Sequence, residues 1–587
     1  MCGVCGEISF SGTIDPGRVH AMAEKLRSRG PDDEGLYAQD GIVLGHRRLR
    51  ILDLSAFSNQ PMVDPELGLV VSFNGCIYNF RELREELIRL GFRFFSGGDT
   101  EVISKAYRAW GPRCVERFLG MFAFAVFDRE NGRVTLARDR LGVKPLYYAE
   151  LPGRFRFAST LPALLASGGI DTSLDPEALH HYMSFHAVVP APMTILKGVR
   201  KLPPATILTI EPDGTRRQEV YWKLHVGAQP GDEDVTAEEW RAEVLIRLTR
   251  AIDRRRISDV PTGVFLSGGL DSSLVVALLS RLGPALKTFS VGFDRVDEVE
   301  GDEFAFSDLV ARHFGTEHQK ISVDAGRTLE SLPKAIAAMS EPMMSHDAVG
   351  FYILSEEVSK SVKVVQSGQG ADEVFGGYHW YPALMRSNDP VDDYSRLYFD
   401  RDHNEMKTAL APGLLNGDYS REYVERFFTT ATGTPIDRTL QLDTEVMLVD
   451  DPVKRVDNMT MAFGLEARVP FLDHELVELA GRIPAELKVG NGGKYILKEA
   501  ARSVVPHEVI DRKKGYFPVP ALKYIRGPFL DYVRATLEDP RARSRGLFNK
   551  PYIDGLLSDP DRALTPKGHS KIWQVALLEG WLQAHGI

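Results

Sequence analysis

The stretch VPTGVFLSGGLDSSLVVALLSRLG, residues 260–283, decides the fold of the larger part of this chain. Its apolar first part predicts a buried strand, the SGG that follows predicts a tight loop, and the apolar run after the loop predicts a helix. A strand that passes through a tight loop into a helix is the first half of a βαβ unit. Repeated units of this kind build a parallel sheet with helices on both faces.

The same alternation continues along the chain. LKTFSVGF (286–293) and EHQKISVD (317–324) are strand-like, and EFAFSDLVARHFG (303–315) between them has a helical pattern. KSVKVVQSGQGADEVFGG (360–377) again passes from a strand into a glycine-rich loop. We therefore expect residues 241–587 to form a doubly wound α/β domain, whose site lies beyond the carboxyl ends of the strands, where both glycine-rich loops are placed.

The first 210 residues have a different pattern and predict a strand-rich domain with a few outer helices. LGLVVSFNGCIYN (67–79) is strand-like, and MFAFAVFDRENGRVTLARD (121–139) predicts a hairpin that turns at Asn131-Gly132. FRELREELIRLG (80–91) predicts a helix whose apolar face consists of Phe80, Leu83, Leu87 and Leu90. The polar segment 211–240, which contains Gly and Pro, is expected to link domains 1–210 and 241–587.

Composition limits the class of protein. A length of 587 residues exceeds what one hydrophobic core serves, so two or more domains are expected. Hydrophobic residues make up 43%, as in ordinary globular proteins, and the net charge of −10 argues against nucleic-acid binding through a basic face. Four cysteines are too few for a disulfide framework, and the chain has neither a secretory start nor an apolar run of about 18 residues. We expect a cytoplasmic enzyme without nucleic-acid or membrane partners.

The loop Ser267-Gly268-Gly269 has the properties of a phosphate-binding loop. Two glycines let backbone N–H groups approach a phosphate, and the helix start behind them adds positive potential. Asp271 is placed to hold a magnesium ion on that phosphate. No Gly-Lys-Ser/Thr follows, so this is not a Walker A loop. A plain strand-to-helix turn, with Asp271 as its cap, is the alternative.

SGGLDSS (267–273) resembles the pyrophosphate loop of the N-type ATP pyrophosphatases, which cleave ATP to AMP and pyrophosphate while they adenylate a carboxylate. SGQGADEVFGGY (367–378) resembles the matching loop of the asparagine synthetases, and LEARVPFLD (465–473) and RKKGYFPVP (512–520) also resemble this family. The resemblance implies ATP as a substrate and magnesium held by Asp271 and Asp372. The residues that it implies for ATP binding are Leu266, Ser267, Gly268, Gly269, Asp271, Ser272, Val291, Gly292, Ser367 and Gly368.

Lys494, in NGGKYILKEA (491–500), stands where this family keeps a lysine that stabilises negative charge in the transition state. Taken singly, a lysine is more often solvated, and an aspartate such as Asp372 is more often a helix cap. Their joint occurrence in the order of the family supports the catalytic interpretation.

The chain begins MCGVCGEISF, residues 1–10, and this start resembles the class II glutamine amidotransferases. The resemblance implies an Ntn-type αββα sandwich in which Met1 is removed and Cys2 is the nucleophile. Elementary chemistry supports this role. A thiol with a pKa of about 8.5 is mostly protonated at neutral pH, and an adjacent α-amine with a pKa of about 7.7–8.0 can take its proton and later return it to ammonia. A metal or redox pair of Cys2 and Cys5 is the alternative, although no second pair with zinc-like spacing follows.

Further segments match this family in order: SRGPD (28–32), GHRRLRILD (45–53), FNGCIYN (73–79) and GGDTE (97–101). The resemblance implies that Arg48 clamps the α-carboxylate of glutamine. It also implies that Asn74 and Gly75 form the oxyanion hole and that Asp99 holds the α-ammonium. Many relatives have Asn-Gly-Glu at this point, whereas this chain has Cys76 in place of the glutamate. Asp99 is therefore expected to bind the α-ammonium of glutamine with less help from a second carboxylate.

Together the two halves resemble the glutamine-hydrolysing asparagine synthetases. This implies glutamine hydrolysis at Cys2, ammonia passing through an internal channel, and attack on an acyl-adenylate. Those enzymes have Ser-Gly-Glu-Gly in the second loop, whereas this chain has Gln369, so aspartate is not the expected acceptor.

HHYMSFHAVVPAP (180–192), NGCIYN (74–79) and SGQGADEVFGGYHWYP (367–382) resemble a narrower group, the N-acetylglutaminylglutamine amidotransferases. Those enzymes amidate the terminal carboxylate of that dipeptide and so produce an osmoprotectant. Tyr378, His379 and Trp380 are candidates for reading the dipeptide, and the family implies a homodimer. An asparagine synthetase is one alternative. A non-catalytic nucleotide-binding regulator is the other, and the complete set of catalytic residues argues against it.

Overall fold

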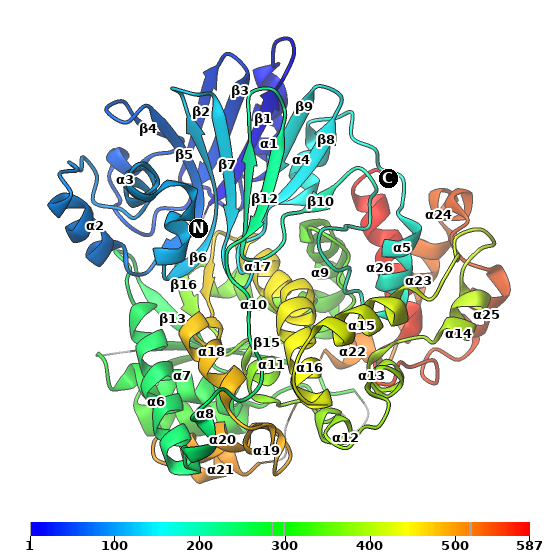
Figure 1. Cartoon of the computed structure of the whole chain (residues 1–587). Helices are drawn as coiled ribbons and strands as arrows, with labels where there is room; N and C mark the ends of the chain where they lie inside the picture. The colour runs from blue at the N-terminus through cyan, green and yellow to red at the C-terminus, as the bar shows by residue number, and fades with distance from the viewer. Residues whose placement is uncertain (1, 284–285, 297–299, 513–514, 516–518) are drawn as a thin grey trace.

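The computed structural model describes residues 2–283, 286–296, 300–512, 515 and 519–587. Most of RKKGYFPVP (512–520) therefore lies outside the described part. Figure 1 shows two domains, one built from the blue and cyan strands and one from the green to red part of the chain. Within the described ranges, no helix has both the length and the apolar character that crossing a membrane requires.

The first domain contains two six-stranded sheets in which all neighbouring strands are antiparallel. The first sheet has the order β10-β8-β9-β1-β3-β2, and the second has the order β12-β11-β7-β6-β5-β4. The strands of the first sheet are β1 (Gly3–Ser9), β2 (Asp33–Gln39), β3 (Ile42–Arg48), β8 (Tyr147–Leu151), β9 (Arg154–Ala158) and β10 (Arg200–Lys201). Those of the second are β4 (Met62–Asp64), β5 (Leu69–Ile77), β6 (Gly120–Asp128), β7 (Arg133–Arg138), β11 (Thr206–Ile210) and β12 (Arg216–Val220).

The two sheets pack face to face over a shared core to which Val4, Leu44, Val70 and Phe127 contribute. Helices α1 and α4 contact the first sheet, and α3, with α2 beside it, contacts the second. This layering confirms the expected αββα sandwich. The helices of this domain are α1 (Pro16–Lys25), α2 (Phe80–Arg89), α3 (Thr100–Trp110), α4 (Leu161–Ala166) and α5 (Pro176–Ser184).

Local expectations for the first domain agree with the structure with one exception. The hairpin at Asn131-Gly132 is confirmed, because β6 and β7 pair up to Asp128 opposite Arg133. Helix α2 buries three of the four expected apolar residues, but Leu90 is 57% exposed. The helix ends at Arg89, so Leu90 lies beyond the face that packs on the domain.

The segment 211–240, which was expected to link the two domains, contains a strand and the start of a helix. Residues Arg216–Val220 form β12, which pairs with β11 along its whole length, and α6 (Ala237–Arg254) begins before residue 240. An edge strand with largely exposed side chains needs no apolar alternation, so its sequence resembles that of a loop.

The second domain contains a five-stranded parallel sheet with the order β15-β14-β13-β16-β17. Its strands are β13 (Thr262–Phe265), β14 (Lys287–Phe293), β15 (Glu317–Val323), β16 (Val364–Gln366) and β17 (Glu466–Arg468). Helices α7 (Leu270–Ser280) and α8 (Phe304–Phe314) form one group, and α9 (Ala325–Ala338) and α10 (Asp347–Val358) form another. Both groups contact β14, which confirms the doubly wound arrangement. The strand order reverses beside β13, and ligands bind such sheets at this point.

The remaining helices are inserted before β17 or follow it. The insertion between β16 and β17 contains α11 (Ala371–Phe375), α12 (Tyr381–Leu384), α13 (Pro390–Tyr398), α14 (His403–Ala409), α15 (Tyr419–Thr430), α16 (Pro435–Leu442) and α17 (Lys454–Met461). After β17 come α18 (His474–Arg482), α19 (Ala485–Val489), α20 (Tyr495–Ala501), α21 (His507–Ile510), α22 (Pro520–Lys523), α23 (Gly527–Glu538), α24 (Pro540–Arg545), α25 (Lys550–Ser558) and α26 (Lys571–Ala584).

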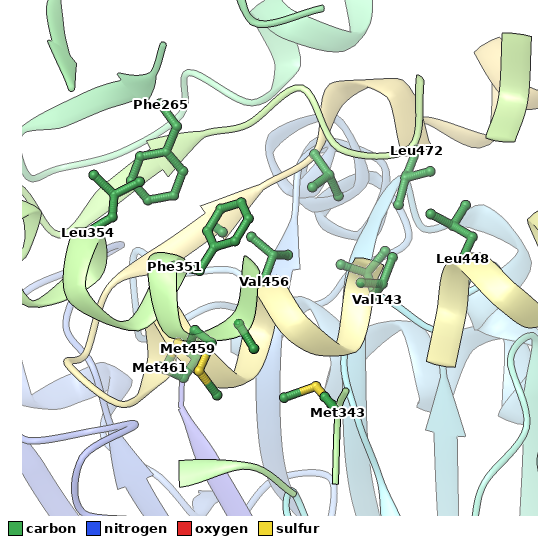
Figure 2. Close-up of a cluster of buried hydrophobic side chains, with 14 of the residues drawn as sticks. Val143, Phe265, Met343, Phe351, Leu354, Leu448, Val456, Met459, Met461 and Leu472 are labelled. Atoms are coloured by element: carbon green, nitrogen blue, oxygen red, sulfur yellow. The ribbon is translucent and has the colours of Figure 1, made fainter. Parts of the chain in front are cut away.

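One hydrophobic core continues across the junction of the two domains. Val143 of the first domain belongs to the same buried cluster as Val456, Met459 and Leu472 of the second, and Figure 2 shows part of this cluster. The core surrounds a buried ionic group, in which Asp457 of α17 binds Arg29 at 2.8 Å and Lys144 at 3.1 Å. Both cations come from the first domain. Burial raises the pKa of Asp457, but the charges of Arg29 and Lys144 outweigh this effect and lower it.

Replacement of Asp457 by Asn should destabilise the protein strongly, because two buried cations then lose their counter-charge. We expect a loss of about 3–5 kcal/mol, measured as a shift in thermal unfolding followed by circular dichroism. Since the pKa of Asp457 is lowered in the folded chain, its contribution is complete above the ordinary carboxyl pKa of about 3.9 and fades below it.

The matched control is Asp393→Asn, which removes one partner of the solvent-exposed Arg396–Asp393 pair. Its effect should stay within about 1 kcal/mol. Equal shifts for the two variants would show that the buried position of Asp457 carries no special weight.

Candidate functional site

The first candidate site lies at the start of β1, beside the last residues of β5 in the second sheet. Cys2 immediately precedes β1 and is buried. Its backbone N–H donates to Oδ1 of Asn74 at 3.0 Å, so the nitrogen beside the thiol is fixed against β5. Burial raises the pKa of the Cys2 thiol, and the Leu49 N–H and the Arg48 charge only partly oppose this. The thiol therefore needs a nearby base before it can act as a nucleophile.

Asn74 and Gly75, the residues expected to form the oxyanion hole, are neighbours on β5. The Nδ2 of Asn74 is buried and has no hydrogen-bond partner among the described residues, so this donor is available to a ligand. A Cβ at Gly75 would lie 2.1 Å from the backbone oxygen of Met121. Only glycine fits this close approach of β5 to β6.

Arg48 and Asp99 both line the pocket that contains Cys2. The Arg48 guanidinium donates at 2.8 Å to the backbone oxygen of Ser55 and so orders the loop that follows β3. The Asp99 carboxylate accepts from the Ile77 N–H at 2.9 Å. Burial nevertheless raises the pKa of Asp99 to about 6, which leaves this carboxylate mostly ionised at neutral pH. The structure thus places Cys2, Arg48, Gly75 and Asp99 around one pocket, with Asn74 beside it.

Two residues of this pocket were not found from the sequence. Glu466 and Arg468 of β17 come from the second domain and line the pocket beside Cys76. Both are fully buried, and the Arg468 guanidinium donates to Glu466 at 2.6 Å. Glu466 and Arg468 were the available signal, since both are charged and lie within the largely apolar run LEARVPFL (465–472). Buried charges require specific partners.

The second candidate site is a cavity of about 160 Å³ at the carboxyl ends of β13, β14 and β16. Ser267 and Ser272 hold the first loop in shape, with their hydroxyl oxygens 3.1 Å apart. Gly268 has a φ of +76°, and a Cβ there would lie 2.6 Å from the Ser307 nitrogen. A Cβ at Gly368 would lie 2.9 Å from the Asp271 Cβ. The two glycine-rich loops therefore touch beyond the carboxyl ends of β13 and β16, which are neighbouring strands. The sequence predicted both loops at this edge of the sheet.

Seven of the ten residues expected to bind ATP line this cavity: Leu266, Ser267, Asp271, Ser272, Val291, Ser367 and Gly368. Gln369, expected at the acceptor site, and Asp372, expected to hold magnesium, line it too. Gly268, Gly269 and Gly292 do not line it. Gly268 and Gly292 serve close packing instead, since a Cβ at Gly292 would lie 2.5 Å from the Asp302 Cβ.

Lys494 joins the two loops. Its ammonium lies 2.6 Å from Oδ2 of Asp271 and 2.8 Å from Oδ1 of Asp372. Burial lowers the pKa of Lys494, but the two carboxylates outweigh burial and raise it above its usual range. Mg²⁺ is usually held by one or two carboxylates together with substrate phosphates. Asp271 and Asp372, which both pair with the ammonium of Lys494, fit the two carboxylates of such a magnesium site.

The cavity is also lined by four acidic residues that were not found from the sequence: Asp302, Glu303, Asp347 and Glu373. Burial and the charge of Asp372 raise the pKa of Glu373 to about 7, and Tyr378 donates to it at 2.5 Å. Burial raises the pKa of Asp347, on α10, to about 6. Of the three candidates for reading the acceptor, Tyr378 lines the cavity, Trp380 stacks on it with ring centroids 4.3 Å apart, and His379 is exposed.

The two sites are connected through β17. The Ser367 N–H, at the start of the second loop, donates at 2.9 Å to the backbone oxygen of Arg468, whose side chain lines the first pocket. Arg468 of β17 thus lines the first pocket and also holds the start of the loop at the second site.

Comparison with known proteins agrees with this architecture. Residues 1–222 match the glutamine amidotransferase domain, and residues 243–583 match asparagine synthase. A sandwich with an N-terminal cysteine, joined to a nucleotide-binding parallel sheet, defines a glutamine-hydrolysing amide ligase. The chain belongs to the asparagine synthase family.

Three relatives show the range of this similarity. The glutamine-hydrolysing asparagine synthetase 1 of Bacillus subtilis is 32% identical, over 99% of this chain and 96% of the relative. A putative asparagine synthetase of Mycobacterium bovis is 34% identical, over 92% of this chain and 91% of the relative. A protein named amidase chry2 from Gibberella zeae is 26% identical, over 90% of each chain.

Replacement of Asn74 by Ala should lower the rate of glutamine hydrolysis by about 10²–10³-fold, because it removes the buried donor beside Cys2. The rate is measured as glutamate released from glutamine. Asn79→Ala is the matched control, since Asn79 follows the same strand and its amide donates to the backbone of Arg117 on the protein surface. A similar loss in both variants would mean that the effect comes from folding and not from the Asn74 amide.

Proposed function

We propose that this chain transfers the amide nitrogen of glutamine to a carboxylate that it first activates with ATP as an acyl-adenylate, with release of AMP and pyrophosphate. The observation that carries the proposal is the pair of sites in one chain, one around Cys2 and one around Asp271, that meet at β17. The relatives named as glutamine-hydrolysing asparagine synthetases support the same reaction class.

In the first site, the reaction begins with the Cys2 thiol. Removal of Met1 exposes an α-amine on the same residue, and this amine takes the thiol proton. The thiolate attacks the glutamine side-chain carbonyl, and Nδ2 of Asn74 donates to the oxygen that becomes negative. The amine then returns its proton to the departing ammonia, and water hydrolyses the thioester left on Cys2, which releases glutamate and restores the thiol. Arg48 and Asp99 hold the two charged groups of the glutamine backbone.

In the second site, the loop Ser267–Gly269 and the start of α7 bind the phosphates of ATP. Asp271 and Asp372 would hold magnesium, which neutralises the charge that develops on the departing pyrophosphate. Lys494 keeps both carboxylates in place and supplies a positive charge beside the same phosphates. Glu373, with a pKa raised to about 7, is able to exchange a proton near neutral pH.

Ammonia has to pass between the sites without being protonated. The core at the junction, which includes Val143, Val456 and Met459, is apolar and excludes water. Neutral ammonia crosses such a region more readily than ammonium does, because an unpaired charge is costly to bury. We place the channel in this core.

We further propose that the acceptor is the terminal carboxylate of N-acetylglutaminylglutamine. Aspartate carries an α-ammonium, which needs an anionic partner in the site. The amino group of N-acetylglutaminylglutamine is acetylated, so this dipeptide has no such positive charge. Gln369 offers a neutral amide at the cavity, and the pKa of Glu373, raised to about 7, leaves that carboxyl partly protonated at neutral pH. These features favour an acceptor with amide groups. The relative named amidase chry2 is consistent with a family that is not confined to one acceptor.

Replacement of Cys2 by Ala should abolish the use of glutamine and leave amidation with added ammonium salts, because the second site does not need the thiol. Asp271→Asn is the complementary variant and should keep glutamine hydrolysis while it loses pyrophosphate release. Both activities are measured on the same preparations. Loss of both activities in either variant would contradict two separable sites.

Incubation of the protein with ATP, magnesium, glutamine and a panel of carboxylic acids should give an amide of N-acetylglutaminylglutamine, identified by mass spectrometry. The same panel should give little asparagine from aspartate. Asparagine as the major product would replace the dipeptide proposal with the asparagine synthetase alternative. Absence of pyrophosphate with every acid would instead favour a non-catalytic nucleotide-binding regulator.

A further inference from the structure

Three side chains of types that bind metals lie close together, on or next to helices that carry none of the residues assigned to the two reaction sites. His180 belongs to α5, His403 is the first residue of α14, and Asp418 immediately precedes α15. Helix α5 contacts both α14 and α15 (Figure 1). One potential ligand atom of each residue lies within 4.8 Å of those of the other two. We propose that His180, His403 and Asp418 bind one divalent transition-metal ion of the zinc class.

Two of the three side chains have an unused polar atom at the cluster. Neither Nε2 of His180 nor Nδ1 of His403 has a hydrogen-bond partner in the described part of the chain. His180 is fully buried, so leaving its Nε2 without a partner is destabilising. The nearest carboxylate oxygen, on Asp418, is 3.8 Å from Nε2 of His180, which is too long for a hydrogen bond. A bound cation would satisfy all three groups together.

The opposite ring nitrogen of His180 is already engaged, which favours Nε2 as the ligand atom. Nδ1 of His180 and Nδ1 of His181 each lie 3.0 Å from the Ser420 hydroxyl oxygen. This hydroxyl has one proton and can donate to only one ring, so the other ring must donate to it. When His180 is the ring that donates, its Nε2 carries a lone pair directed away from Ser420. Hydrogen bonds of this kind commonly orient metal-binding histidines.

The dimensions and donor types suit a zinc-class ion. A tetrahedral ion with bonds of about 2.0–2.1 Å places its donor atoms about 3.3 Å apart, so the three side chains need to approach by at most about 1.5 Å. Two imidazoles and one carboxylate favour zinc or a similar transition metal over Mg²⁺, which prefers oxygen. The side chain of Asp418 is 29% exposed, and water can therefore complete the coordination.

Such an ion would join parts of the chain that are distant in sequence. Helix α5 lies in residues 1–210, whereas α14 and α15 lie in the insertion between β16 and β17. The ion would fix this insertion to the first domain at a place where Ser420 and the aromatic ring of Tyr419 already pack on His180.

The test measures zinc binding by the full-length protein. Chelator-treated protein is dialysed against excess Mg²⁺ with a small amount of Zn²⁺, and the metal retained after a second dialysis is quantified. We expect about one zinc per chain in the wild type and loss of that zinc in His403→Gln and Asp418→Asn. Both replaced residues are partly exposed, and Asn at 418 keeps the oxygen that caps α15. Zinc should raise the thermal midpoint of the wild type and leave that of these two variants unchanged.

His181→Gln is the matched control, because it changes a buried histidine on the same helix that shares Ser420 but lies outside the proposed ligand set. This variant should retain zinc. Glutamine hydrolysis without zinc serves to confirm that each variant is folded. Co²⁺ should bind in place of zinc with an absorption spectrum typical of tetrahedral coordination. The proposal fails if the wild type retains no more zinc than His403→Gln, if both ligand variants retain it fully, or if His181→Gln loses it equally.

Discussion

The structure depends on two charges that must be buried where the domains meet. Glu466 and Arg468 lie on β17, the edge strand of the nucleotide-binding sheet, and both are inaccessible to solvent. Removing an ion pair from water is costly, and the cost is offset only when every donor and acceptor finds a partner. Arg468 meets this condition by donating to Glu466 and to the backbone oxygens of Arg255 and Ile257. These contacts allow only one placement of β17, and that placement sets the distance between the two sites.

The second buried ionic group reinforces this constraint. Arg29 and Lys144 of the first domain converge on Asp457 of α17 within the apolar core shared by both domains. Hydrophobic contacts alone tolerate small sliding movements, whereas buried charged groups with short hydrogen bonds do not. An enzyme that passes a small reactive molecule between two sites benefits from such a fixed junction, because a gap there would admit water and protonate ammonia.

The electrostatic character of the two sites differs according to the chemistry proposed for each. Around Cys2, burial disfavours the thiolate, so the nucleophile forms only when a base is adjacent. Around Asp271 and Asp372, two carboxylates are held close together by the ammonium of Lys494. Like charges at this distance require a cation, and both Lys494 and a metal ion with bound phosphates meet that need. Further along the same cavity, Glu373 has a pKa raised to about 7 and adds little negative charge.

Local patterns in the sequence were sufficient for much of this description. The strand–loop–helix at 260–283, the hairpin at Asn131-Gly132 and the phosphate loop all depend on residues adjacent in the chain, so their conformations follow from periodicity and turn chemistry. Resemblance to families then supplied residues of both pockets, among them Cys2, Arg48, Asp271 and Asp372, although not most of their lining. The sequence by itself did not give the role of β17, the edge strand β12 or the cluster around His180. Each of these depends on partners far away in the chain, such as Arg468 with Cys76 or His180 with Asp418, and only tertiary packing decides which distant groups meet and which of them lose their contact with water.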